Sequence, residues 1–322
     1  MTDRQKRILM GLLIGVIASA LIHLGTRISG FVLTDLMDGY EYKSYDARMK
    51  SGAAFSEEAS IDDVVIIDIE QNSVESMGNY HAWPHAFHGQ LTDVVSSGNP
   101  KALIFDIIFD EKGTDNYYLM DALASNQAET SPELQQATDQ FLVSNDPTRF
   151  VWSTSQSDVA YHALVFENSD TTNFLYSMDQ IPEAYNASNH VIKISPDIAE
   201  KLPTAERLGN TYFDLLTSSH GTGAANFPQD EDGIIRRAPT AIHFKGSGEV
   251  FPTLVLAAAK DILGIASDGF IYDFDNHVLR LQDTTGTVVR EIPIDDQGRM
   301  YVNYYGMYKT FYYIPYMYCF DP

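Results

Sequence analysis

The chain has 322 residues and a formal net charge of −23 at pH 7. This acidic balance argues against nucleic acid as a partner, because no basic stripe is present to neutralise phosphates, and equally against an anionic lipid surface. The single cysteine, Cys319, excludes intramolecular disulfides and zinc sites built from several thiolates. The length suffices for one large domain or two small ones.

Residues 1–28 predict a membrane anchor. A basic segment, 1–7, precedes an uncharged and mostly apolar run from Ile8 to Thr26. As a helix with a rise of about 1.5 Å per residue, this run spans about 28 Å, close to the thickness of a hydrocarbon core. The basic segment predicts a cytoplasmic N-terminus and export of the remainder. A cleaved signal peptide is the alternative, because Ala18-Ser-Ala20 suits a signal peptidase. The apolar run continues beyond that site and favours an uncleaved anchor.

A helix and two buried strands, separated by a second helix, are predicted between residues 29 and 111. The first helix covers 29–50, where apolar side chains recur at helical spacing. Two apolar, β-branched runs, 63–70 and 101–111, are typical of strands buried on both faces. Between them, Pro84–Ser97 predicts a helix with proline in its first turn. A helix between two such strands predicts a right-handed βαβ crossover, with both strands parallel in one sheet.

Helices and strands are expected to alternate in the middle of the chain. The helices are predicted at 117–125 and 132–142, and the strands at 150–153 and 159–166. Ser131 is the expected N-cap of the second helix. Residues 167–203 are polar and predict an insertion of low order. The glycine-rich Ser219–Gly223 predicts a turn, because it lacks the strand-to-helix context of a phosphate loop.

An antiparallel extension is predicted from Ala224 onward. Asp232-Gly233 is typical of a hairpin turn, with strands at 234–236 and 240–244 after it. An EF-hand loop is excluded, because with Gly233 as its sixth residue the first and twelfth positions are both proline. Residues 253–263 predict a buried helix. Further strands are expected at 270–274, 278–281, 288–292 and 300–304, with turns at Asp275-Asn276, Thr285-Gly286 and Gln297-Gly298.

The fold class that follows is α/β. We expect a central, mixed and partly parallel sheet with flanking helices, an antiparallel extension and an N-terminal transmembrane helix. Within this fold, acids fall at or just past the carboxyl ends of the two predicted strands, which is where open α/β sheets place ligands. A tryptophan and a histidine stand at the start of the helix between them, and an arginine able to grip an anion follows the Asp-Gly turn. The candidate ligand-binding residues are Asp68, Glu70, Trp83, His85, Asp106 and Arg236, and Asp110 extends the acidic set.

Each candidate has a structural alternative. Acids at strand ends cap helices and turns, a tryptophan before a proline packs at a helix start, and Arg236 can form a salt bridge with Asp68 or Asp106. His85 and His88 share a helix face and would need Asp68 or Asp106 to complete a metal site. Surface or capping histidines are the alternative, and no metal is assigned. No G-x-S-x-G, Walker or H-E-x-x-H motif is present, so neither a catalytic residue nor a cofactor is assigned.

A set of short motifs occurs in a fixed order along the chain. They are Tyr45-Asp46-Ala-Arg48, Val-Val-Ile-Ile-Asp68-Ile-Glu70, Trp83-Pro84-His85 with His88, Ile104-Phe-Asp106-Ile-Ile-Phe-Asp110-Glu111, Asn226-Phe-Pro-Gln-Asp230-Glu-Asp232-Gly233-Ile-Ile-Arg236-Arg237, Phe251-Pro252-Thr253-Leu254 and Val302-Asn303-Tyr304-Tyr305-Gly306. This combination resembles the CHASE domain of type two, an extracytoplasmic sensory module of cyclases and histidine kinases. The resemblance covers residues 31–322 and departs from the family pattern at His85, where a second aromatic residue is usual after Trp-Pro.

The resemblance implies a sensory domain, residues 29–322, in the periplasm or outside the cell and held in the cytoplasmic membrane by residues 1–28. It implies no enzymatic activity for the residues present. It implies that a signal passes to a cytoplasmic output module, first a class III adenylate or guanylate cyclase and next a histidine kinase. The family continues beyond a segment like 310–322 with a closing strand, membrane helices and an output domain, so the chain is expected to be a fragment.

Two rival functions remain open at this point. One is an exported ligand-binding or surface-assembly protein without enzymatic output, and the other is a metal-dependent enzyme at the strand ends. Besides the membrane, the expected partner is an unknown small ligand or a partner protein. The helix at 29–50 either forms a homodimer contact or packs on its own domain. The signal is expected to act by shifting the population of two arrangements.

Overall fold

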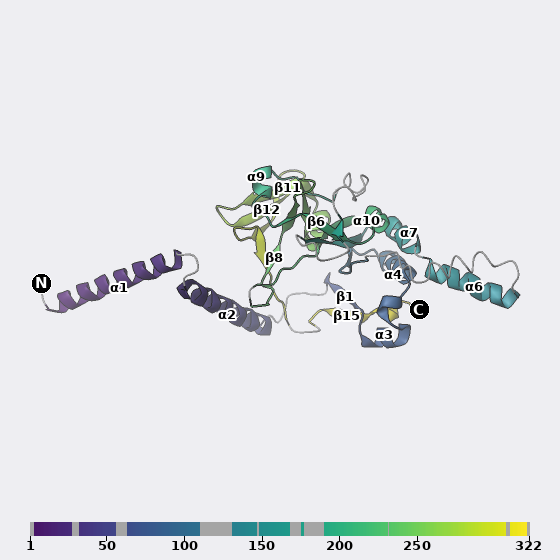
Figure 1. Cartoon of the computed structure of the whole chain (residues 1–322), viewed down its shortest axis with the longest axis horizontal. Coiled ribbons are helices and arrows are strands. Elements are labelled where there is room, and N and C mark those ends of the chain that lie inside the picture. The colour runs from purple at the N-terminus through teal and green to yellow at the C-terminus, as the bar shows by residue number, and fades with distance from the viewer. Residues whose placement is uncertain are drawn as a thin grey trace. The chain divides into compact units, whose positions relative to one another are not determined.

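The computed structural model of the chain contains two compact units, whose elements are labelled in Figure 1. One unit comprises Met1–Ile66 with Asn303–Tyr313, and the other comprises Ile67–Val302 with Ile314–Pro322. The structure describes residues 3–27, 32–55, 63–109, 131–146, 148–167, 175–176, 190–230, 232–306 and 310–320. The helix predicted at 117–125 and the acid Asp110 lie outside these residues.

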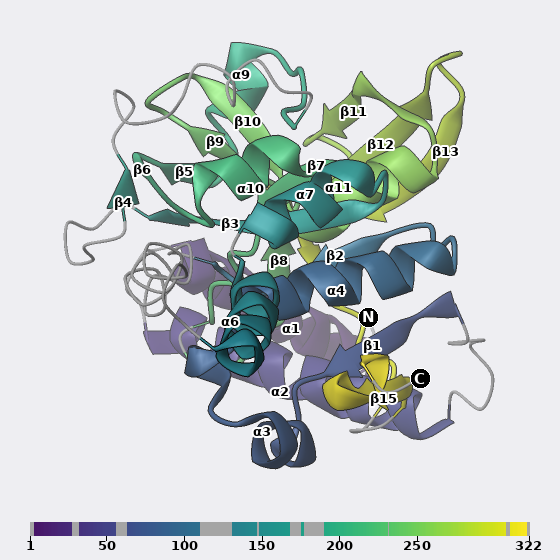
Figure 2. The same ribbon diagram turned by 90° about the vertical axis from the view of Figure 1, so that its right-hand side faces the viewer.

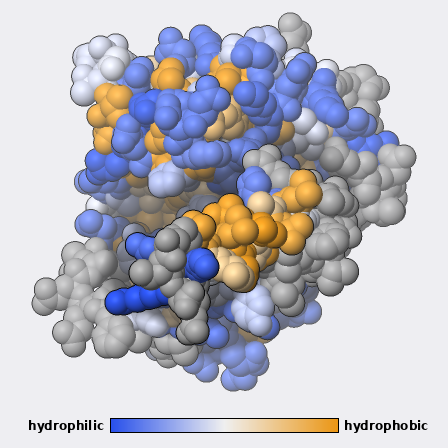
Figure 3. Space-filling view, turned by 90° about the vertical axis from the view of Figure 1, so that its left-hand side faces the viewer, coloured by the Kyte–Doolittle hydropathy of each residue, from blue (hydrophilic) through white to orange (hydrophobic). Residues whose placement is uncertain are grey.

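Two long helices open the described part of the chain. α1 spans Asp3–Arg27 and α2 spans Val32–Phe55, which confirms the helix predicted at 29–50. Within the described residues, one helical stretch, Arg4–Gly25, is long and apolar enough to cross a membrane. Its side chains are exposed, with Leu12 at 63%. Figure 3 shows a patch of hydrophobic side chains on the face of the molecule that it draws.

A mixed sheet of five strands forms the centre of the second unit. It contains β2 (Leu103–Phe105), β3 (Ala160–Glu167), β4 (Leu175–Tyr176), β6 (Arg207–Asn210) and β7 (Gly221–Ala224). β3 is the central strand and pairs parallel with β2 and β7 and antiparallel with β6, which also pairs antiparallel with β4. The predicted mixed and partly parallel sheet is therefore confirmed.

Helices cover both faces of β3. Alternate side chains of a strand point to opposite faces. Tyr161 and Ala163 accordingly pack in one cluster with α11 (Leu254–Ile262), whereas His162 contacts Phe150 of α7 (Thr148–Gln156). Figure 2 shows α7, α11 and α10 (Phe213–Ser218) next to β3 and β7. This two-sided cover explains why β3 is an almost continuous buried run.

Two of the helices that precede β3, α4 and α6, begin as the sequence predicts. Pro84 is the N-cap of α4 (His85–Ser97), and Ser131 caps α6 (Pro132–Asn145) by accepting a hydrogen bond of 3.3 Å from the amide of Leu134. α4 packs on α7 at close range. A Cβ atom at Gly89 of α4 would lie 3.0 Å from the Cα atom of Phe150, so a larger residue there would push the helices apart.

Strands β8 to β14 form the predicted antiparallel extension, and β5 pairs parallel with β9 of this extension. The strands are β5 (Thr204–Ala205), β8 (Arg237–Pro239), β9 (Ala241–Phe244), β10 (Glu249–Pro252), β11 (Ile265–Asp273), β12 (Val278–Asp283), β13 (Val288–Pro293) and β14 (Arg299–Tyr301). The turns predicted around Asp275-Asn276, Thr285-Gly286 and Gln297-Gly298 are confirmed. Gly286 and Gly298 adopt φ angles of +82° and +68°, which favour glycine.

The predicted βαβ crossover is wrong. β1 (Val65–Asp68) pairs with β15 (Tyr312–Pro315) in a sheet of its own, whereas β2 belongs to the central sheet. The parallel crossovers of the central sheet are instead β2–α7–β3 and β3–α10–β7. β1 is also not buried on both faces, because Val65 is 50% exposed. An apolar run indicates a strand, but its partner is chosen by distant parts of the chain.

Three local predictions are also wrong, because burial in the tertiary structure overrides a weak local pattern. Residues 150–153 belong to α7 rather than to a strand, and Ser219–Gly223 leads into β7 rather than forming a turn. Residues 190–203 are not an insertion of low order. They include α9 (Pro196–Ala199), and Leu202, 3% exposed, lies in the core. The helix predicted at 253–263 is confirmed as α11, although one of its faces is exposed.

Candidate functional site

The structure places the six predicted site residues in separate surroundings. Trp83 and His85 lie in one cluster of aromatic and histidine side chains. Arg236 lies in a network of arginines and aspartates. Asp68 ends β1 and Asp106 follows β2, and these strands belong to different sheets. The predicted common edge for the acids therefore does not form. Within the described residues, no group of three or more His, Cys, Asp or Glu side chains can hold a metal ion.

Glu70 caps a helix, as its structural alternative predicts. Its carboxylate accepts hydrogen bonds from the backbone amides of Asn72 and Ser73 and, at 2.9 Å, from the Ser73 hydroxyl. These amides open α3 (Gln71–Met77), whose positive N-terminal end is stabilised by a negative charge. Asp106 is exposed and Asp68 is partly buried. Their predicted role as ligand contacts stays a prediction.

Trp83 and His85 belong to a set of packed rings, here called the aromatic–histidine cluster. Its members are Trp83, His85, His88, Phe105, Phe109, Phe150, His162, Tyr212 and Tyr316. Trp83 is 5% exposed, and its indole nitrogen donates a hydrogen bond of 2.9 Å to the carbonyl of Gly78. It also packs against Tyr316, with ring centroids 5.0 Å apart. Trp83 is thus anchored by packing at the start of α4, beyond the short helix η2 (Tyr80–Ala82).

His88 connects α4 to the C-terminal end of the described chain. Its Nδ1 atom lies 2.8 Å from the hydroxyl of Tyr316, which begins the short helix η6 (Tyr316–Cys319). His88 is 2% exposed, and burial together with the nearby His85 lowers its pKa to about 3. The surface role considered for His88 is therefore wrong. A second contact of 3.1 Å, from the amide of Met317 to the hydroxyl of Ser73, joins η6 to α3.

His162 is the most enclosed histidine of the cluster. It is fully buried in β3 and stacks on Phe105 with ring centroids 4.8 Å apart and planes within 3°. Burial and the neighbouring His88 lower its pKa to about 3, so the ring is neutral at physiological pH. Among the described residues neither ring nitrogen has a hydrogen-bond partner. Neutral imidazoles in such surroundings act as flat packing groups, not as general bases.

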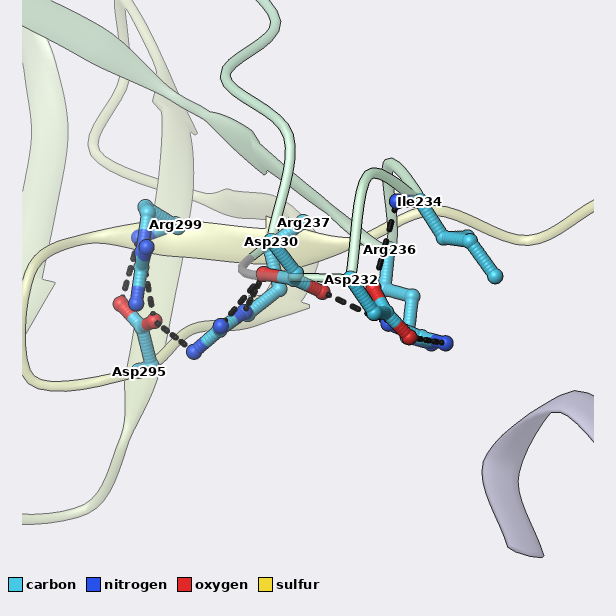
Figure 4. Close-up of polar contacts among 7 residues, drawn as sticks. All are labelled: Asp230, Asp232, Ile234, Arg236, Arg237, Asp295 and Arg299. Carbon is cyan, nitrogen blue, oxygen red and sulfur yellow. Dashed lines mark hydrogen bonds and ion pairs between the residues drawn. The ribbon is translucent and has the colours of Figure 1, made fainter. Parts of the chain in front are cut away.

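Arg236 stands in an alternating series of charged side chains, here called the arginine–aspartate network (Figure 4). Two guanidinium nitrogens of Arg236 donate hydrogen bonds of 2.9 and 2.7 Å to the two carboxylate oxygens of Asp232. One of these nitrogens also donates a hydrogen bond of 3.3 Å to Asp230. Arg237 also binds Asp230 and lies 3.8 Å from Asp295, which in turn accepts a hydrogen bond of 2.8 Å from Arg299. Arg236 is 2% exposed, so its charge is balanced almost entirely by protein groups.

The network corrects two expectations about the Asp232-Gly233 turn. Arg236 pairs with Asp230 and Asp232, not with Asp68 or Asp106. The turn itself is confirmed, because Gly233 adopts a φ angle of +81° and its amide bonds the carbonyl of Asp230 at 2.8 Å. It is not a hairpin, since residues 234–236 form no strand and β8 pairs with β14. The hydrogen bond from Arg236 lowers the pKa of Asp232.

A small pocket beside α11 was not predicted from the sequence. This cavity of about 140 Å³ is lined by segments that are far apart in the chain, among them His190, the start of β7, the end of β10 and the last turn of α11. Its polar lining comes from His190, His220, Thr222, Lys260 and Asp261. No local motif joins these residues, and residues 219–223 predict a turn when taken alone.

No curated protein and no solved structure matches the chain. The family model of the CHASE2 domain matches residues 16–321, which is nearly the whole chain. The match includes the Trp83-Pro84 start of α4 and the arginine–aspartate network described above. The chain therefore belongs to the CHASE2 domain family, a family of extracellular sensory domains.

Proposed function

We propose that the chain is the membrane-anchored sensory part of a receptor, with α1 in the cytoplasmic membrane and the second unit on the outer side. The observation that carries the proposal is the family match over residues 16–321 together with an exposed, apolar helix at Arg4–Gly25. The basic side chains before that helix support a cytoplasmic N-terminus. The output module that receives the signal is a class III nucleotide cyclase, with a histidine kinase as the second choice.

Contacts between the two ends of the second unit support a route for the signal. β1 pairs with β15, the amide of Met317 bonds Ser73, and Tyr316 bonds His88. Segments close to the start and to the end of the sensory unit are therefore held by one set of contacts. A stimulus that favours a second arrangement of this set shifts the position of both segments together. The packed rings around His88 would make that change discrete rather than gradual.

Labelling of single cysteines tests the membrane topology. Cys319→Ser removes the native thiol, and Arg4→Cys or Lys245→Cys then introduces one thiol before α1 or at an exposed site after β9. We expect a membrane-impermeant maleimide to label the Lys245→Cys chain in intact cells and the Arg4→Cys chain only after lysis. The reverse pattern, or extraction of the whole chain by alkaline carbonate, would contradict the anchor.

The coding sequence after Pro322 and the activity of its product test the output. We expect further membrane helices and a cyclase domain, and formation of a cyclic nucleotide when the complete gene is expressed in a cyclase-deficient host. A kinase domain supports the second choice. A stop codon directly after Pro322 would favour the rival function, an exported binding or surface-assembly protein without enzymatic output.

A further inference from the structure

The pocket beside α11 is rich in hydrogen-bond donors. Among the described residues, Asp261 supplies the one carboxylate of its lining. This carboxylate accepts a hydrogen bond of 2.9 Å from the Tyr161 hydroxyl and lies 3.4 Å from Nζ of Lys260 and 3.7 Å from Nε2 of His220. Three donor groups thus converge on a single acceptor group, and His190 and Thr222 add further polar side chains to the lining.

Lys260 is unusual because its side chain is only 14% exposed. Lysines are rarely buried to this extent without a partner of opposite charge. Asp261 is a partner of opposite charge, and its own side chain is 33% exposed and shared with Tyr161 and His220. The pocket therefore contains a largely buried ammonium group next to a carboxylate that interacts with several donors at once.

His190, in the lining of the pocket, shows which of the nearby charges has the larger influence. Burial has the largest effect on its pKa, which falls to about 4, and the charge of Lys260 lowers the pKa more than Asp261 raises it. His220 lowers it further. At this imidazole the charge of Lys260 therefore outweighs that of Asp261, which favours a bound anion even in a chain with a net charge of −23.

The walls of the pocket are preorganised by close packing. Gly221 lines the cavity, and a Cβ atom at this position would collide with the Tyr161 ring. Because glycine leaves that space, Tyr161 can lie against β7 and place its hydroxyl on Asp261. The Tyr161 ring also packs edge-on against His220, with centroids 5.3 Å apart. Fixed donors lower the entropic cost of binding a small ligand.

We propose that this pocket binds a small oxyanion, with Lys260 as its charge partner and His190 and His220 as hydrogen-bond donors. The cavity of about 140 Å³ limits the ligand to a few non-hydrogen atoms. Its size is close to that of the ~150 Å³ cavity that admits benzene. A short-chain carboxylate and inorganic phosphate share this chemistry. The proposal rests on the proposed sensory function and adds to it the chemical class of the signal, a small oxyanion.

Binding to the full chain in detergent micelles tests the proposal. Isothermal titration is carried out with sodium acetate, sodium succinate and sodium phosphate at constant ionic strength, with glycine and ethylammonium chloride as a zwitterionic and a cationic probe. We expect at least one of the three oxyanions to bind, and the identity of that oxyanion distinguishes a carboxylate from an inorganic ligand. Binding of glycine or ethylammonium in place of all three would overturn the proposal, as would the absence of any binding.

Three variants separate charge recognition from a folding defect. Lys260→Gln removes the charge partner and is expected to weaken binding by about tenfold or more. Lys245→Gln, the same change at an exposed lysine, is expected to leave binding unchanged. Asp261→Asn keeps an acceptor for Tyr161 but removes the competing charge, so it is expected to tighten oxyanion binding, a gain that misfolding cannot produce. Equal affinities for the two lysine variants, or weaker binding by Asp261→Asn, would overturn the proposal.

Binding is measured without any signalling readout, so its outcome is independent of the proposed function. If no oxyanion binds but the topology and the output are as proposed, the sensory function stands and the ligand assignment falls. If an oxyanion binds but Lys245→Cys is labelled only after lysis, the pocket stands and the exported sensory function falls.

Discussion

Two consecutive residues of β3 have side chains that lie in two different kinds of protein interior. The side chain of His162 enters the aromatic–histidine cluster, where rings fill the space and where His88 and His162 are neutral. The side chain of Tyr161 points to the other face and bonds Asp261 at the pocket, where charged groups surround a cavity. Both regions contain buried histidines with lowered pKa values. The comparison indicates that neighbouring residues decide the role of a histidine: it packs among other rings in the cluster, and near Lys260 it lines a cavity.

Truncation of a ring in the cluster should have the largest effect on stability. Phe150→Ala removes a fully buried side chain between Phe105, Phe109 and His162, and we expect it to lower the free energy of unfolding by about 3–5 kcal/mol. Trp152→Ala on the same helix is the matched control, because Trp152 is 59% exposed. Chemical denaturation followed by circular dichroism measures both. A similar loss for the two variants would show that the cluster is not the stabilising region.

Acidification should destabilise the cluster next most strongly. His88 and His162 have pKa values of about 3 in the folded chain, against 6.5 when unfolded. Between these values the unfolded chain binds protons that the folded chain does not. Stability is therefore expected to fall as the pH falls, by about 1.4 kcal/mol per pH unit for each histidine. Denaturation at a series of pH values gives the slope. His162→Met should reduce this slope by the contribution of one histidine, and an unchanged slope would contradict the lowered pKa of His162.

Loss of one hydroxyl tests the link between α4 and η6. Tyr316→Phe leaves Nδ1 of His88 without its partner, at an expected cost of about 1–3 kcal/mol. Tyr318→Phe, on the same short helix and 61% exposed, is expected to change little. In a His88→Phe background, Tyr316→Phe should cost less, because the lost interaction is already absent. Full additivity of the two changes would argue against a direct contact.

Substitutions at the pocket should change stability least. Lys260→Gln breaks the ion pair with Asp261, whose side chain is 33% exposed and keeps Tyr161 and His220 as partners, so we expect the free energy of unfolding to change by about 1 kcal/mol or less. The two regions then differ in what their variants change: cluster variants change stability, whereas pocket variants change oxyanion binding. If Lys260→Gln destabilises the chain as much as Phe150→Ala, the pocket is a packing site and the comparison fails.

Predictions that depend on neighbouring residues were the most accurate. Ser131 caps α6, Pro84 precedes α4, and Gly233 occupies a turn, because each of these features follows from the chemistry of a few adjacent residues. Among the candidate site residues, Glu70 caps a helix, and this cap is also a local interaction. The partners of Arg236 could have been found in its own turn, since Asp230 and Asp232 are close in sequence.

Features that depend on distant segments could not be predicted in this way. The acids Asp68 and Asp106 end up in different sheets because β1 pairs with β15, whose residues come from the other end of the chain. The pocket likewise needs His190, His220 and Lys260 to be brought together by β7, β10 and α11. No spacing rule connects these positions.

By itself, the sequence determined the apolar N-terminal helix, the alternation of helices and strands, the turns and the family. These depend on hydrophobic periodicity, on backbone preferences of proline and glycine and on an ordered set of motifs. The tertiary structure alone decided which strands pair, that residues 150–153 are helical, and that two faces of β3 lead to a ring-filled core and to a charged cavity. These outcomes depend on burial and on contacts between distant residues, whose energies exceed the local preferences they override.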